Sequence, residues 1–169
     1  MEEARQLCVS LLTKIHEQID GAGHLVRLLP PDCLDVAPPI PSTWPVGILL
    51  GHMLDCVAGF CAVLYAFEPQ QLAHFAGLRE LPVNHRCAPG EANRRMAIYR
   101  TQIDEGFLLL RDANLGQQVR TVFVERGESV LTLLLGNLEH LVNHKHQLFT
   151  YLKMLGVSVT SQDLYRFRG

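Results

Sequence analysis

The sequence predicts an all-α protein, a four-helix bundle with a long crossover between helices two and three. Three observations predict this fold. Apolar residues recur every three or four positions in four long segments, no repeated strand pattern occurs, and Pro- and Gly-rich stretches separate the segments. The 169 residues are about the length of one domain, so we expect a single domain over residues 1–169, with residues 157–169 as a C-terminal tail.

The first helix is predicted over residues 4–29, because its apolar side chains form one stripe. The stripe consists of Leu7, Leu11, Ile15, Ile19, Ala22, Val26 and Leu29. Pro30 and Pro31 end this helix, and six of the nine prolines fall between residues 30 and 45, where they remove backbone donors and helical freedom. We therefore expect a long ordered loop before the second helix.

The second helix is predicted from a cap at Ser42 or Thr43 to about Phe67. Only His52 and Asp55 are strongly polar in it, so its length and composition would allow a membrane span. An acid in mid-membrane costs about 2.5–3.5 kcal/mol, and no basic cluster flanks the segment, so we expect no membrane and a helix buried on most faces. A homodimer is the simplest cover for the remaining apolar surface, with the Pro-rich loop or the crossover as alternatives.

The crossover is predicted over residues 68–90, where the helical periodicity breaks. A short helical turn is expected around residues 71–78. The third helix follows, and its inner face is predicted to consist of Met96, Tyr99, Ile103, Phe107 and Leu110.

Residues 117–124 are rich in β-branched side chains and are expected to be extended. Gly127 separates them from the fourth helix. This helix is predicted from about Glu128, an acid at the positive end of the helix dipole, to Leu155, with Gly156 at its C′ position.

Composition restricts the function. Hydrophobic residues make up 48%, charged residues 19%, and the net charge is −2, so we expect no nucleic-acid partner, which needs clustered Lys and Arg. The first residues are acidic and continue as an amphipathic pattern, unlike a signal peptide. The five cysteines contain no Cys-x2-Cys pair, which fits a reducing compartment, so we expect a cytoplasmic protein.

The most specific chemical signal is a set of three histidines. His140 and His144 lie one helical turn apart, and His52 lies in the middle of the apolar second helix. If these helices pack together, the three imidazoles can bind a divalent transition metal, with zinc expected first and nickel or iron as alternatives. Three protein ligands leave a fourth position open, as in catalytic rather than structural zinc sites.

Other interpretations of these residues stay open. His52 alone resembles a core histidine, and the His140 and His144 spacing also arises on solvated helix faces. Asp55 is a candidate for orienting a ligand imidazole or acting as a general base, or else a buried acid bonded to a neighbouring helix. Cys56, four residues after His52, would allow a mixed His/Cys site.

The other histidines are interpreted as structural or surface residues. His146 lies about 200° around the helix from His144 and cannot share its site. The remaining four have no helical partner at ligand spacing: His16, His24, His74 and His85.

Two motifs carry a family resemblance. The segment from His140 to Gln147 reads His-x3-His-Lys-His-Gln, and Trp44 precedes His52 by eight residues. Together they resemble the DinB/YfiT-like superfamily, whose last helix usually carries His-x3-His-Arg-Gly-Gln. The resemblance implies a four-helix bundle with His52, His140 and His144 as its three metal ligands. The departure, Lys145-His146 in place of Arg-Gly, is expected to change the surface just beyond the ligands.

That superfamily includes bacillithiol S-transferases and mycothiol-dependent maleylpyruvate isomerases. The resemblance therefore implies a metal-dependent enzyme of the thiol S-transferase or hydrolase type, acting on a small molecule or with a low-molecular-weight thiol. The alternative is a non-catalytic, stress-related binding protein in which the metal is structural. Arg94, Arg95 and Arg100 are candidates for receiving an anionic thiol cofactor, or else form a solvated face of the third helix.

Overall fold

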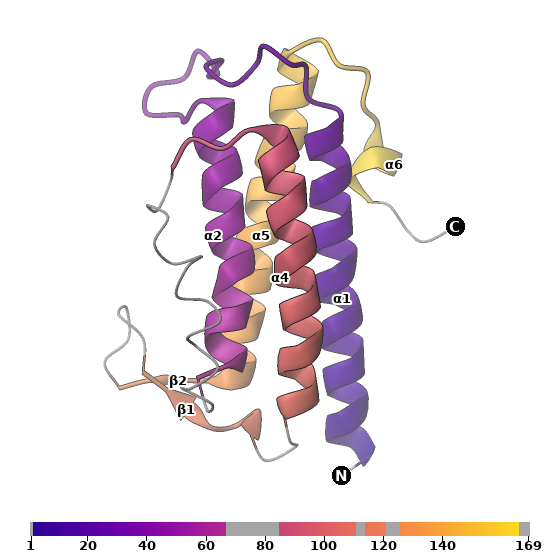
Figure 1. Cartoon of the computed structure of the whole chain (residues 1–169), viewed down its shortest axis with the longest axis vertical. Coiled ribbons are helices and arrows are strands. Elements are labelled where there is room, and N and C mark those ends of the chain that lie inside the picture. The colour runs from indigo at the N-terminus through magenta and orange to yellow at the C-terminus, as the bar shows by residue number, and fades with distance from the viewer. Residues whose placement is uncertain (1, 67–84, 111–113, 121–125, 166–169) are drawn as a thin grey trace.

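A computed structural model describes residues 2–66, 85–110, 114–120 and 126–165. Four long helices form the body, and Figure 1 shows them side by side along one axis. Helix α2 packs on α5 and α4, and α1 packs on the same two helices. The predicted all-α four-helix bundle is confirmed.

The direction of the helices explains the crossover. Helices α2 and α4 run in the same direction, because Cys61 contacts Tyr99 and the later residue Tyr65 contacts the later residue Gln102. Parallel neighbours cannot be joined by a short turn, which explains why a long connection separates α2 from α4 in the sequence. The predicted helical turn around residues 71–78 lies outside the described residues.

Helix α1 spans Glu2–Arg27. Its predicted stripe is buried from Leu11 onward, whereas Leu7 is 43% exposed. The helix ends two residues before the predicted Leu29, because the amides of Leu28 and Leu29 donate to carbonyls three residues back and tighten the last turn. The Pro-rich loop that follows is held to the next helix by bonds from the amides of Val46 and Gly47.

Helix α2 spans Val46–Leu64, and the predicted cap is wrong. Pro45 occupies the N-cap position, and its carbonyl accepts the first helical bonds. The hydroxyl of Thr43 donates instead to loop carbonyls at Pro38 and Ile40. Length and composition alone would let this helix cross a membrane, but 67% of the apolar window is buried within the bundle, as in a core helix.

The side of α2 that faces away from the other long helices contacts segments of the same chain. Gly47 faces the carbonyl of Leu34 in the Pro-rich loop, and a Cβ at Gly51 would overlap the carbonyl of His85. These contacts favour the two alternative covers, the loop and the crossover. The homodimer stays a prediction.

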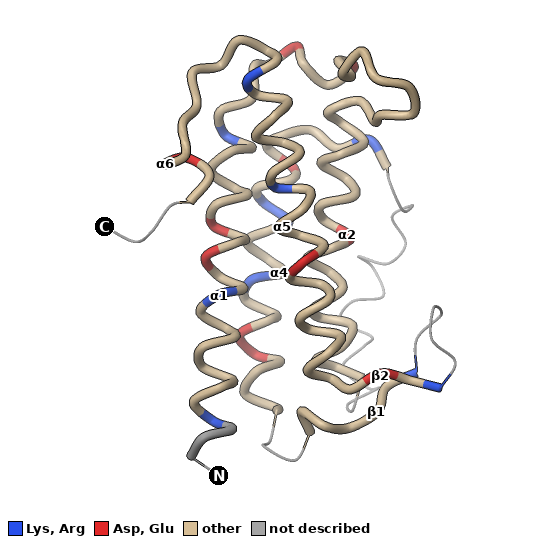
Figure 2. The backbone as a smooth tube through the Cα atoms, turned by 180° about the vertical axis from the view of Figure 1, so that it is seen from behind, with Lys and Arg blue, Asp and Glu red and all other residues tan. Residues whose placement is uncertain are grey.

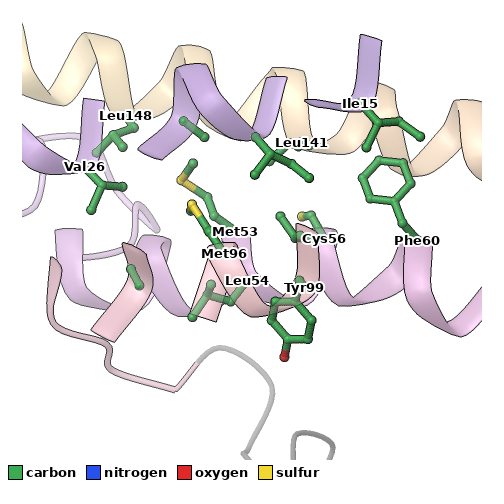
Figure 3. Packing of buried hydrophobic residues seen from close by; sticks show 14 of the residues in the cluster. Ile15, Val26, Met53, Leu54, Cys56, Phe60, Met96, Tyr99, Leu141 and Leu148 are labelled. Atoms are coloured by element: carbon green, nitrogen blue, oxygen red, sulfur yellow. The ribbon is translucent and has the colours of Figure 1, made fainter. Parts of the chain in front are cut away.

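Helix α4 spans Pro89–Leu109. Four of its predicted inner residues are buried, and Leu110 is half-buried just beyond the helix. Figure 3 shows Met96 and Tyr99 of α4 beside Met53 and Leu54 of α2, in a core that side chains from all four long helices fill. Figure 2 shows basic positions spread along the described backbone and interspersed with acidic ones.

The fourth long helix begins later than predicted. Strand β1 (Gln118–Val119) pairs antiparallel with β2 (Glu128–Ser129), so Glu128 is part of a short ladder rather than the first helical residue. Helix α5 spans Val130–Met154 and is capped by the Ser129 hydroxyl, which accepts from the amide of Thr132. Its end is confirmed, since Gly156 adopts a positive φ of 78°.

The C-terminal tail docks on the bundle. A short helix, α6 (Ser161–Leu164), contacts α1 and α5, and Leu164 is buried. Asp163 both completes the capping box of Thr160 and contacts His24 of α1 at 2.9 Å. Tyr165, just after this helix, is 58% exposed.

Candidate metal centre

Three histidines from two helices meet at one point. The Nε2 atoms of His52 on α2 and His140 on α5 lie 3.0 Å apart. The ring centroid of His144 is 4.5 Å from that of His52 and 4.8 Å from that of His140. Antiparallel packing of α2 on α5 brings them together, since residues one turn apart on α5 flank a single position on α2.

The spacing of these nitrogens fits a bound metal ion. Zinc binds imidazole nitrogen at about 2.0–2.1 Å, so two tetrahedral ligands would lie about 3.3–3.4 Å apart. The observed 3.0 Å between His52 and His140 is a few tenths of an ångström shorter. The residues present could therefore hold a metal ion.

Partial desolvation lowers the pKa of two of these imidazoles, although His140 lies at the exposed edge of the site. Desolvation lowers the pKa of His140, and the neighbouring rings of His144 and His52 lower it further. Desolvation also lowers the pKa of His144, although its hydrogen bond to Gln147 acts in the opposite direction. Neutral imidazole is the form that binds metal, so little proton competition is expected near pH 7.

Cys56 joins this group, a position that the sequence left open. One ligand atom from each of His52, Cys56, His140 and His144 can be chosen so that all four lie within 4.8 Å of one another. The thiol is 2% exposed, and burial, with the charge of Asp55, raises its pKa to about 12. The signal was its spacing of four residues from His52, the same spacing that linked His140 to His144.

Asp55 is not one of the four converging ligand residues. It is half-buried. Burial is the main cause of the raised pKa of both Tyr99 and Cys56, and the charge of Asp55 adds to it. Its role in orienting a ligand or accepting a proton stays a prediction.

The indole of Trp44 lies against the histidines. Its ring centroid is 4.6 Å from that of His52 and 5.9 Å from that of His144, on which it stacks. The sequence marked Trp44 only as part of a motif, and its contact with the site depends on the fold of the Pro-rich loop. This half-buried ring covers part of the His52 and His144 imidazoles, whereas His140 is exposed.

A hydrogen bond at Nδ1 orients His144, whereas the ring of His52 is held by packing. Nδ1 of His144 lies 2.9 Å from Oε1 of Gln147, one turn further along α5. Nδ1 of His52 is buried and has no hydrogen-bond partner within the described parts of the chain. The packing of Trp44, rather than a hydrogen bond at Nδ1, therefore restrains that ring.

One of two predictions about residues near the site is wrong. Lys145 is 3% exposed instead of lying at the surface, because one residue past His144 the helix has turned by about 100°. Its Nζ donates to Oε1 of Gln18 at 2.6 Å and to the carbonyl of Leu164 at 3.0 Å, on the side of α1 and α6. His146 is exposed and contacts Phe149, as its helical angle predicted.

The arginines of α4 do not form one solvated face. Arg94 is exposed and Arg100 contacts Asp20, but Arg95 is 2% exposed. Its guanidinium donates to the hydroxyl of Tyr99 at 3.0 Å and lies 2.8 Å from Nε2 of His85.

A second group of possible ligands lies at the start of α4. It comprises His85, Cys87 and Glu91. The guanidinium of Arg95 already occupies Nε2 of His85, and its positive charge opposes a cation there. His85 thus has partners that the sequence did not reveal, as do His16, 2.8 Å from Asp104, and His24. The cluster between α2 and α5 is the better candidate for a metal site.

The fold has a counterpart among solved structures. It is similar to the crystal structure of the DinB-like protein YjoA from Bacillus subtilis, with a TM-score of 0.66 over 89% of this chain and 94% of that one. Sequence identity is 15%, so the similarity concerns the fold, and the expected DinB-like bundle is confirmed. No family model and no curated protein matches the sequence.

Proposed function

We propose that this protein binds one divalent transition metal ion through His52, His140 and His144 and is a metal-dependent enzyme of the thiol S-transferase or hydrolase type. One observation carries the proposal. Three imidazoles from two helices converge, with the two closest nitrogens 3.0 Å apart, near the separation that a tetrahedral ion requires. Zinc is the first candidate, and nickel and iron also accept three imidazoles.

The ion would supply Lewis acidity that activates a thiol or water in its open position. The chain's own residues set the conditions for that chemistry. Three neutral imidazoles leave the positive charge of the ion uncompensated, which favours an anionic fourth ligand such as a thiolate. Trp44 covers two of the rings and restricts water, so a small thiol or electrophile would approach beside it.

Metal analysis of the purified protein tests the ligand set. We expect about one ion per chain in the wild type and in His146→Ala, whose exposed side chain is outside the cluster. His144→Ala should lose the ion under the same loading. Absence of stoichiometric metal, or metal content unaffected by replacing any of the three histidines, would contradict the proposal.

A turnover assay tests the enzyme class. Low-molecular-weight thiols are combined with electrophiles, and esters or amides are supplied separately, with protein in the metal-loaded and chelator-treated states. Turnover that disappears on chelation, returns with metal and is absent in His144→Ala supports an enzyme. Full activity of chelator-treated protein would contradict a metal-dependent reaction.

The second candidate is a structural metal site, and Cys56 favours it. A thiolate from Cys56 would add a fourth protein ligand, and four protein ligands close a tetrahedral zinc site. Cobalt substitution separates the two candidates. A structural site predicts a thiolate-to-cobalt absorption band in the wild type. Cys56→Ala should then lose this band and bind the metal at least about tenfold more weakly. An open catalytic site predicts no such band and an unchanged affinity. Cys61→Ala is the matched control, a buried thiol of the same helix that faces Tyr99.

A further inference from the structure

A chain of three hydrogen bonds connects His144 to the backbone of the Pro-rich loop. Nδ1 of His144 lies 2.9 Å from Oε1 of Gln147, and Nε2 of Gln147 donates to the hydroxyl of Tyr151 at 3.1 Å. That hydroxyl donates to the carbonyl of Trp44 at 3.0 Å. The spacing of three and then four residues keeps the three side chains on one face of α5.

The last acceptor determines the direction of the whole chain. A backbone carbonyl can only accept, so Tyr151 must use its single proton on Trp44. The hydroxyl oxygen is then an acceptor towards Gln147, which must present its NH2 group to it. The amide oxygen therefore faces His144 and requires a proton on Nδ1, which leaves Nε2 with a free lone pair for a metal ion.

The reversed chain fails at both ends. With the amide of Gln147 turned over, its oxygen and the carbonyl of Trp44 would compete for one hydroxyl proton of Tyr151, and one acceptor would lose its donor. The NH2 group would face Nδ1 of His144 and would need a lone pair there. The proton would then move to Nε2, where it blocks metal binding. Tyr151 is 4% exposed, so the lost bond would not be readily replaced by water.

We propose that Gln147 and Tyr151 are positioning residues, through which the backbone carbonyl of Trp44 selects the metal-binding tautomer of His144. The part of this inference that concerns metal rests on the proposed function. The tautomer itself is a property of the metal-free protein. The same chain places the Trp44 indole, which packs on His52 and His144, so the loop and the ligand are set together.

The neutral amide of Gln147 has a further consequence for the ligand in the open position. Metal-binding histidines often donate to a carboxylate, which adds negative charge to the site. Here the partner is an amide, so the site keeps the full charge of the ion. This feature favours an anionic fourth ligand, such as a thiolate, over a neutral one.

Nitrogen NMR of the imidazole groups tests the tautomer in metal-free protein, at about pH 8 where histidine is neutral. We expect His144 of the wild type to carry its proton on Nδ1. In Tyr151→Phe, which leaves the ring packing intact and does not alter any group that touches His144, we expect a mixture of both tautomers. Gln147→Leu should give the same mixture, whereas Gln147→Glu keeps an acceptor at Nδ1 and should restore the Nδ1 proton.

Tyr65→Phe is the matched control. Tyr65 is also buried and also donates to a backbone carbonyl, that of Gln102, but it lies at the far end of α2. It should leave the tautomer of His144 unchanged. A tautomer in Tyr151→Phe identical to that of the wild type, or a change of equal size in Tyr65→Phe, would overturn the inference.

Zinc affinity, measured by competition with a chromophoric chelator, is the second readout. Tyr151→Phe and Gln147→Leu should bind zinc at least about tenfold more weakly than the wild type, within the range typical of partners to ligand histidines. Gln147→Glu should retain the affinity. If the wild type binds no zinc, the proposed function fails while the tautomer measurement still decides the role of Gln147 and Tyr151. If the wild type binds zinc and the variants bind it equally well, the positioning inference fails alone.

Discussion

Replacement of His144 by alanine should remove most of the stabilisation that zinc gives to the folded protein. An ion that binds only the folded state stabilises it by about 2.7 kcal/mol when its free concentration is 100 times the dissociation constant. For a chain of this size, 1 kcal/mol shifts the melting temperature by about 2–4 °C. Zinc should therefore raise the melting temperature of the wild type by roughly 5–11 °C.

The structure determines how much of this shift His144→Ala removes. The variant keeps His52 and His140, whose Nε2 atoms lie 3.0 Å apart, but it loses the third imidazole and the only ligand tied to the Gln147 chain. Loss of a hydrogen-bond partner of a ligand weakens metal binding by about 10–100-fold. Loss of the ligand itself should weaken it by at least about 100-fold. At the same zinc concentration the remaining stabilisation is then about 0.4 kcal/mol, or about 1–2 °C.

Thermal unfolding, followed by circular dichroism with and without zinc, measures this difference for each variant. Comparing each protein with itself cancels the stability change that the substitution causes without metal. His146→Ala is the control, because it removes an exposed imidazole from the same helix and should keep the full shift. An equal zinc shift in the wild type and His144→Ala would refute the assignment of His144 as a ligand.

The remaining predictions concern pH and backbone contacts. Zinc affinity should fall as the pH drops below the range in which the imidazoles of α5 are neutral, because protons then compete for the ligand nitrogens; calorimetric titration at several pH values measures this, and an unchanged affinity at acidic pH would contradict it. The hydrogen bond from His24 lowers the pKa of Asp163 to about 2, so this carboxylate stabilises the fold above its ordinary pKa of 3.8, and the contribution is lost as the pH falls towards 2. Asp163→Asn should therefore be less stable than the wild type in urea at pH 7 and should approach it in acid, and a pH-independent difference would contradict the lowered pKa of Asp163. Gly51→Ala should lower the free energy of unfolding by at least about 2 kcal/mol, since the new Cβ would overlap the backbone carbonyl of His85, whereas Gly136→Ala, in open space on α5, should raise it by about 0.5–1 kcal/mol. Equal effects of the two glycine substitutions in urea unfolding would contradict the close approach at Gly51.

The helices were predictable because their apolar stripes belong to single segments. Spacing of three and four residues is a local property, and residues such as Ile15, Ile19 and Ile103 are buried as their patterns predicted. The start of the fourth helix was not predictable in this way. Glu128 and Ser129 have a partner strand at Gln118 and Val119, ten residues earlier, and this pairing outweighs a favourable dipole position.

The site was predictable in its imidazoles and less so in its surroundings. The spacing of His140 and His144 on one helix indicates a metal site. His52, in the apolar second helix, was the third candidate ligand. Cys56 has the same spacing from His52, but nothing in the sequence says that its thiol faces α5. The contacts of Trp44 depend on the path of a loop that periodicity does not describe.

Charged residues gave the least reliable signal. Arg95 and Lys145 both occupy positions that a charge pattern assigns to the surface, and both are almost fully buried. Each is accommodated by polar partners from other segments, His85 for the first and Leu164 for the second. These partners lie outside the helix that carries the charged residue, so a pattern read along one helix does not reveal them.

Trp44 gives the protein a built-in optical probe of its own site. It is the only tryptophan among 169 residues, and its ring lies within 6 Å, centroid to centroid, of two of the three histidines. Tryptophan emission therefore comes from this one place, with no background from the rest of the bundle. Loading with a paramagnetic ion, entry of a substrate or displacement of the Pro-rich loop should each be visible in the emission of the unlabelled protein.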